Sequence, residues 1–156
     1  MDWKEYAERA EAIKPRLFRT AVVYLNSESA AEEALDEALY KGLSTCRKLR
    51  QAEYFETWLT RILLNACADE RRRKKRLLDI DELPETAVEA FDALPLREAV
   101  ARLPKDLKAI VILRYFSGYT LREAAEILDI PQGTAATRQR RALALLRLEL
   151  GEGDDK

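Results

Sequence analysis

The sequence predicts an all-α protein with two small helical domains joined by an acidic linker. Only five of the 156 residues are glycine, no segment alternates convincingly between apolar and polar residues, and apolar residues recur at helical spacing through most of the chain. We expect a first domain over residues 1–76, an acidic linker over residues 77–93, and a four-helix second domain over residues 94–156 that contains a helix-turn-helix.

The net charge is close to zero, but the charges are unevenly distributed along the chain. The sequence has 27 Lys and Arg against 28 Asp and Glu, for a net charge of −1 at pH 7. Residues 71–76 read RRRKKR, whereas residues 77–96 contain acidic residues and no basic one. Because partners respond to local charge, this distribution is compatible with a nucleic-acid-binding surface although the total charge does not suggest one.

The composition gives no indication of catalysis. The chain has no His, its two Cys show no paired spacing, and no glycine-rich phosphate loop is present. These absences disfavour a zinc site and remove the commonest general base, so we expect no enzyme activity, no metal and no cofactor. The chain also lacks an apolar run of about 18 residues and a signal peptide, so we expect a cytoplasmic protein without a membrane span.

Two helices are expected before residue 50. An apolar face starts at Trp3 and continues to Leu25, and Pro15 predicts a kink or the start of a second helix within it. Asn26 should end this segment. A capping-box pair three residues apart, Ser29 with Glu32, predicts the start of the next helix. The apolar side of that helix should carry Leu35, Ala38, Leu39, Leu43 and Cys46, with Gly42 weakening it, and its outer face is acidic.

The strongest amphipathic pattern of the first half begins at Phe55. Its apolar residues follow helical spacing without a gap, and Trp58 is interpreted as a core residue rather than a ligand. The opposite face carries Arg61, Asn65 and Arg72 and leads into the basic run. Polar groups that can read bases, followed by a phosphate-binding patch, are typical of a nucleic-acid contact, although a solvated basic helix end is the alternative.

The second domain is expected to begin near Leu96. A further helix should start at Pro104, carry apolar residues as far as Tyr115 and end at Gly118. A helix-turn-helix should follow. Thr120 and Glu123 form a second capping-box pair, the helix should stop before Pro131, and Thr134 can cap the next helix after the bend at Gly133.

The last helix has two different faces. An apolar face should bury Ala135, Ala142, Leu143 and Leu146, and Thr137, Arg140 and Arg141 lie opposite, with Arg138 on the flank. In a helix-turn-helix, the N-terminal half of the second helix is the part that reaches base edges in a major groove. The last helix carries its arginine-rich outer face near that half. An ordinary helical hairpin with a solvated basic face is the alternative.

Two long stretches together resemble a known family. FETWLTRILLNACADERRRKKR is similar to the −10-reading segment of bacterial RNA polymerase sigma factors, and LPKDLKAIVILRYFSGYTLREAAEILDIPQGTAATRQRRAL is similar to their −35-reading domain. The resemblance is to the extracytoplasmic-function (ECF) class of the sigma-70 family. It covers nearly the whole chain, and the two segments occur in the same order.

The resemblance implies a transcription initiation factor without catalysis of its own. Residues 1–76 would grip the clamp of the polymerase core and read the −10 element, and residues from about 94 onward would bind the flap and read the −35 element. The linker would pass through the RNA exit path. An anti-sigma factor is implied as a further partner besides core polymerase and promoter DNA.

The resemblance also assigns roles to individual residues. Asn65 falls where the family has an Asn that contacts a flipped −10 base. The expected −10 contacts are Arg61, Asn65, Arg72, Arg73, Lys74 and Arg76, and the expected −35 contacts are Thr134, Thr137, Arg138, Arg140 and Arg141. The expected polymerase-binding residues are Glu32, Glu33, Asp36 and Glu37.

The sequence departs from the family pattern at several positions. Asp36 stands where Gln is frequent in the polymerase-binding helix. Leu43 replaces an aromatic residue, and Asp129 stands where the turn usually has Gly. Because Leu49 replaces a frequent Phe and Ala136 replaces a frequent Lys or Arg, the promoter sequence cannot be transferred from relatives.

Two other functions are compatible with parts of the sequence. One is a stand-alone helix-turn-helix regulator that binds DNA without polymerase, and the other is an adaptor whose basic helices bind an acidic protein. A plain regulator needs neither the acidic helix surface at Glu32–Glu37 nor a second nucleic-acid surface at Arg61–Arg76, so these features favour the sigma-factor hypothesis.

Overall fold

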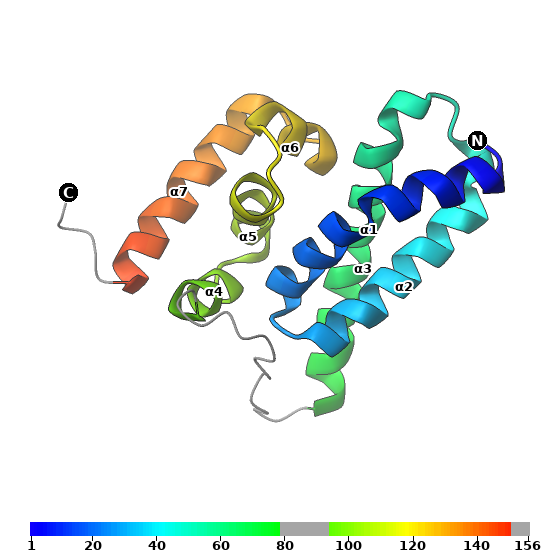
Figure 1. The fold of residues 1–156 in the computed structure, drawn as a ribbon. Coiled ribbons are helices and arrows are strands. Elements are labelled where there is room, and N and C mark those ends of the chain that lie inside the picture. Colours follow the sequence, from blue (N-terminus) through cyan, green and yellow to red (C-terminus); the bar gives the residue numbers. More distant parts are fainter. Residues whose placement is uncertain (79–93, 151–156) are drawn as a thin grey trace.

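The computed structural model describes residues 1–78 and 94–150, and all regular elements in these ranges are helical (Figure 1). The first half is formed by three long helices that pack on one another, with two short 3-10 turns before the third. Their bounds are α1 Trp3–Leu25, α2 Glu28–Thr45, η1 Cys46–Lys48, η2 Ala52–Tyr54 and α3 Phe55–Leu78.

The second half contains four α-helices and one π-helical turn. The bounds are α4 Leu94–Ala101, α5 Lys105–Val111, η4 Ile112–Phe116, α6 Leu121–Leu128 and α7 Gln132–Leu150. The prediction of an all-α fold is therefore confirmed for the described residues. The linker prediction over residues 77–93 lies mostly outside them.

Two expectations about helix starts in the first half are wrong. Of the two alternatives at Pro15, a kink or the start of a second helix, the second is wrong, because α1 continues through Pro15 to Leu25. Helix α2 is capped by Ser27, whose side chain accepts from the Ala30 amide, and Ser29 lies inside the helix. The left-handed Asn26, with φ of 54°, ends α1 directly before Ser27. The N-cap of α2 is therefore two residues earlier than the Ser29–Glu32 pair predicts.

The π-helical turn η4 changes which side chains face the core. The Ser117 amide donates to the Ile112 carbonyl five residues back (2.9 Å), so one residue more is accommodated in this turn than in an α-helix. Ile112 and Leu113 are buried, whereas Tyr115 is exposed, contrary to the helical spacing expected from sequence. The sequence pattern also places Trp3 and Leu43 on apolar faces. Both side chains are exposed instead, Trp3 at the start of α1 and Leu43 on the surface of α2.

The two halves share one continuous hydrophobic core. Helices α1 and α3 pack against α4, η4 and α6, as seen at the centre of Figure 1. Polar contacts accompany this packing. The Thr20 hydroxyl meets that of Ser117, and the Tyr119 hydroxyl donates to the Glu56 carboxylate (2.8 Å) and lies 3.2 Å from the Thr60 hydroxyl. The halves are therefore held together by complementary buried groups in this arrangement.

Gly42 is required by the packing of α1 on α2. A Cβ atom at this position would lie 2.9 Å from the Tyr6 ring, whose hydroxyl is fixed by donation to the Leu39 carbonyl (2.7 Å). We expect Gly42→Ala to lower the stability of the protein by about 1–3 kcal/mol, because the ring must move out of its site. Thermal unfolding would measure this.

The matched control is Gly133→Ala. A Cβ at Gly133 would meet nothing within 4 Å, and this residue lies in the first turn of α7. Alanine should leave stability unchanged or raise it by about 0.4–1 kcal/mol, because it restricts the unfolded chain. Equal loss of stability in the two variants would contradict the role given to Gly42.

Candidate nucleic-acid and polymerase interfaces

Helices α6 and α7 form the helix-turn-helix. The predicted capping box is confirmed: the Thr120 hydroxyl accepts from the Glu123 amide (3.0 Å), and the Glu123 carboxylate accepts from the Thr120 amide (2.9 Å). Asp129 ends α6 in the left-handed conformation, with φ of 60°. A short polar residue tolerates this conformation better than most, which explains how the turn forms without glycine.

Thr134 does not cap α7. The helix begins at Gln132, and the Pro131 carbonyl accepts from the Ala135 amide (3.0 Å), so Thr134 is a half-buried residue of the first turn. The fixed φ of proline favours a helix start at this point, which the sequence reasoning had placed three residues later. The prediction of Thr134 as a cap is therefore wrong.

The outer face of α7 is formed as predicted. Ala135, Ala142 and Leu146 are buried against the rest of the second half. On the opposite side three expected −35 residues are exposed together, and the Arg140 guanidinium donates to the Thr137 hydroxyl (3.4 Å). These exposed residues are Thr137, Arg140 and Arg141.

Arg138 lies apart from this group. Its guanidinium faces the Asp106 carboxylate of α5 at 3.9 Å and is partly covered. Because the side chain is oriented toward α5, it is less available to DNA than Arg140 or Arg141 in this arrangement.

The polar face of α3 is directed at the helix-turn-helix. Arg61 donates to the carbonyls of Ile127 (2.9 Å) and Glu126 (2.7 Å) at the C-terminal end of α6, where the partial negative charge of a helix favours a cation. Asn65 lines a cavity of about 360 Å³ together with Leu128 and Arg138. Two of the expected −10 residues therefore face the second half, although the side chains of both remain exposed to solvent.

The basic end of α3 is partly neutralised. Arg72 pairs with Asp69, and Arg73 pairs with Glu33 of α2 (2.9 Å) and Glu70 (2.8 Å). The hydrogen bond that Arg73 donates to Glu70, together with the charges of the Glu70 and Glu33 carboxylates, raises the pKa of the Arg73 guanidinium. Lys74 and Arg76, in contrast, form no ion pair with any residue that the structure describes.

The acidic face of α2 is exposed as predicted. The side chains of Glu32, Glu33, Asp36 and Glu37 are all exposed. Glu33 is occupied by Arg73, and Glu37 lies 3.9 Å from Lys41 on the same helix. Glu32 and Asp36 are thus the members of this group that the described residues leave without a cation.

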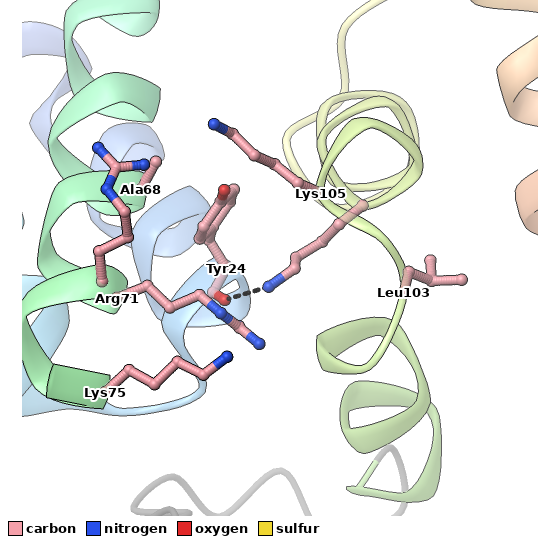
Figure 2. A pocket seen from close by; sticks show the side chains of 8 residues that line it. Tyr24, Ala68, Arg71, Lys75, Leu103 and Lys105 are labelled. Atoms are coloured by element: carbon pink, nitrogen blue, oxygen red, sulfur yellow. Dashed lines mark hydrogen bonds between the residues drawn. The ribbon is translucent and has the colours of Figure 1, made fainter. Parts of the chain in front are cut away.

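Lys108 is a buried cation that the sequence pattern does not single out as a functional residue. Lys108 is only 1% exposed, lies on α5, and donates to the Tyr24 carbonyl of α1 at 3.4 Å (Figure 2). Burial, reinforced by the nearby Arg71 charge, lowers the pKa of Lys108 to about 7. The available signal was a lysine inside the apolar run from Leu107 to Leu113, where a charge at a core position is unusual.

Two general properties follow from the described residues. None of their helices combines the length and the apolar character that a bilayer crossing needs. Nor do three or more of their Cys, Asp and Glu side chains gather in a way that could hold a metal ion.

Sequence comparison gives consistent similarities for both halves. Residues 10–77 match the sigma-70 region 2 family, and residues 93–146 match the sigma-70 region 4 family. RNA polymerase sigma factor SigV of Bacillus subtilis is 31% identical over 146 residues, covering 90% of this chain and 88% of the relative. ECF RNA polymerase sigma factor SigM of Mycobacterium tuberculosis is 29% identical over 141 residues, covering 87% and 72%.

Structural comparison supports the same fold. The sigma factor RpoE, in its complex with the anti-sigma factor NepR from Bartonella quintana, matches with a TM-score of 0.79 at 22% identity and covers 98% of this chain and 99% of that one. CnrH, in complex with the cytosolic domain of CnrY, matches with a TM-score of 0.75 at 19% identity, covering 97% and 90%.

Proposed function

Because this chain belongs to the sigma-70 family of RNA polymerase sigma factors, we propose that its two halves divide promoter recognition between them. Residues 1–76 bind the clamp of the polymerase core and read the −10 element, and residues 94–156 bind the flap and read the −35 element. The polymerase supplies the catalysis, and the site of action is the cytoplasm.

The observation that carries this proposal is the presence of both regions in one chain, each with an exposed surface of suitable chemistry. A stand-alone regulator needs only the helix-turn-helix, whereas this chain also has a region 2 match with an acidic α2 face and a basic α3 end. The relatives are likewise RNA polymerase sigma factors, which supports promoter-directed initiation over the regulator hypothesis.

The residue roles follow from position and exposure. On α7, the exposed side chains of Arg140, Arg141 and Thr137 contact bases of the −35 element. On α3, Asn65 and Arg61 read −10 DNA, and Arg72, Arg73, Lys74 and Arg76 contact phosphate. Two solved relatives of the same fold are bound to partner proteins, one of them named as an anti-sigma factor, which supports an anti-sigma factor as a further partner here.

The packing of the halves places a condition on DNA binding. Arg61 is hydrogen-bonded to the end of α6, and Asn65 faces α6 and α7. Both side chains are exposed, but the Arg61 guanidinium is engaged by the α6 carbonyls, so full contact of this face with DNA requires α3 and the helix-turn-helix to move apart. We therefore infer that polymerase and promoter bind an open arrangement of the two halves.

The test is promoter binding and transcription with and without core polymerase. The free protein should bind duplex DNA weakly, because its net charge is near zero and the Arg61 guanidinium is engaged by α6. Core enzyme should confer promoter binding and initiation in vitro. Tight sequence-specific binding by the free protein, unchanged by core, would favour the stand-alone regulator.

The acidic face of α2 gives a second test. We expect Asp36→Lys combined with Glu37→Lys to weaken binding to core polymerase at least tenfold, or about 1.4 kcal/mol, because charge reversal removes complementarity to a basic clamp surface. Both side chains are exposed, so the fold should persist. Equilibrium binding to fluorescently labelled core would measure the change.

The matched control reverses two exposed acids on α1, Glu8→Lys with Glu11→Lys. It makes the same change in net charge on a different face. Equal loss of core affinity in the two double variants would mean that net charge, rather than the α2 face, governs binding.

A further inference from the structure

A cation-rich pocket lies between the two halves of the molecule. It has a volume of about 290 Å³, and five of its eight lining residues are Lys or Arg. Figure 2 shows Arg71 and Lys75 on α3 at one side and Lys105 on α5 across from them. The cationic lining residues are Arg71, Arg72, Lys75, Lys105 and Lys108.

Among the described residues, no carboxylate lines this pocket to balance these charges. Its remaining lining residues are Tyr24, Ala68 and Leu103. Arg72 is paired with Asp69 outside the lining, but Arg71, Lys75 and Lys105 form no ion pair with any residue in ranges 1–78 and 94–150. Like charges gathered on one concave surface repel one another, and an anion placed among them would remove that cost.

Lys108 is the strongest indication of a missing partner. Its ammonium has three donors, yet its one hydrogen bond is a long one to the Tyr24 carbonyl (3.4 Å), with the Tyr24 ring 4.4 Å away. A buried charge is normally paired and fully hydrogen-bonded. The pKa of Lys108, lowered to about 7 by burial and by Arg71, agrees with a cation that lacks a counter-ion.

We propose that this pocket binds a compact polyanion of the phosphate class, such as a di- or triphosphate group, between α3 and α5. The anion accepts hydrogen bonds from the buried Lys108 ammonium and from Arg71, Lys75 and Lys105 around it. Charge-assisted hydrogen bonds of this kind are about twice as strong as neutral ones.

The shape of the site favours a small polyanion over a nucleic-acid backbone. Lys108 is 1% exposed, so only a group that enters the pocket can reach its ammonium. The phosphates of a duplex lie on a convex surface and would contact the exposed Arg71 and Lys75 at the rim. The binding site therefore differs from the DNA-binding surface assigned to the end of α3, although both use this part of the helix.

The ligand would connect the two halves. Arg71, Arg72 and Lys75 come from the first half, and Lys105 and Lys108 come from the second. A bound anion neutralises the repulsion across the interface, so it should stabilise the packed arrangement. This inference does not depend on the proposed function, because binding is measured on the free protein.

The experiment is calorimetric titration of the free full-length protein with inorganic tripolyphosphate, with sulfate at the same ionic strength as reference. We expect saturable 1:1 binding of tripolyphosphate, and Lys108→Met and Lys105→Gln should each weaken it at least tenfold, or about 1.4 kcal/mol. Lys108→Met keeps an apolar side chain of similar length in the core, and Lys105 is exposed, so both variants should fold, as circular dichroism would verify.

The matched control is Lys48→Gln, which removes one exposed charge outside the pocket and should leave the affinity unchanged. Parallel titrations with GTP distinguish the sources of the phosphate group. Equal affinity for GTP and tripolyphosphate supports recognition of the phosphate chain alone, and tighter binding of GTP supports a nucleotide.

Three results would overturn the proposal. These are the absence of tripolyphosphate binding beyond that of sulfate, an affinity that Lys108→Met and Lys105→Gln leave unchanged, and a loss in Lys48→Gln as large as in the pocket variants. Preferential binding of a short DNA duplex through the same lysines would also overturn it and assign the pocket to nucleic acid.

Discussion

Replacing Arg140 or Arg141 by alanine is expected to relax promoter preference at a single position of the −35 element. Both side chains are exposed on the N-terminal half of α7, opposite the buried Ala142 and Leu146. Arginine can donate two hydrogen bonds to guanine in the major groove, and one such pair contributes about 1–3 kcal/mol of discrimination. The expected loss is roughly 5- to 150-fold at that position.

The measurement is a promoter library transcribed by polymerase with the wild-type protein and with each variant. Preference at the −10 element should stay the same, because α3 is unchanged. Arg147→Ala is the matched control: it removes an exposed arginine near the other end of α7 and should leave every preference intact. A uniform drop across all sequences in both variants would mean that α7 reads its site through other residues or through DNA shape.

Introducing a charge between the two halves is expected to open the molecule. Thr20 is buried on α1, its hydroxyl meets that of Ser117, and the Arg16 guanidinium lies nearby with its own bond to the Ser117 carbonyl (2.9 Å). In Thr20→Lys an ammonium would be buried beside a like charge. A penalty of about 3 kcal/mol or more would act only on the packed arrangement and shift its ratio to the open one roughly 150-fold.

Small-angle scattering would detect this change as an increase above a radius of gyration of about 15 Å, the value expected for a compact chain of this length. The free variant should also bind promoter DNA more tightly, since opening releases Arg61 from the α6 carbonyls and separates Asn65 from α6 and α7. Ala12→Lys adds the same charge at an exposed position of α1 and controls for electrostatic attraction alone. An unchanged radius in a folded Thr20→Lys variant would contradict the requirement for opening.

Several parts of the fold could be predicted because they depend on neighbours within one or two helical turns. The capping box of Thr120 and Glu123, the end of α5 and η4 before Gly118, and the buried face of α7 were each confirmed. Hydrogen bonds and apolar periodicity at these positions involve residues three or four apart, so the local sequence contains the needed information.

The errors of prediction have different physical causes. Ser27 and Ser29 are both suitable caps, and the left-handed conformation of Asn26 decided between them. Tyr115 was assigned to the core because an α-helical period was assumed, and the π-turn changed the register by one residue. Helix propensity alone predicts that Gly42 weakens α2, whereas in the structure it provides the space that Tyr6 occupies.

The sequence alone therefore determined the helical class, the helix-turn-helix and the exposed set formed by Thr137, Arg140 and Arg141. The packing of distant helices sets the surroundings of three other charges: Arg61 is held by α6, Arg73 is paired with Glu33, and Lys108 is buried among other cations. Ile127 lies 66 residues from Arg61, Glu33 lies 40 residues from Arg73, and Tyr24, whose carbonyl accepts from Lys108, lies 84 residues from it. Local periodicity fixes which face of a helix is apolar, but the environment of a charge depends on the helix that packs against it.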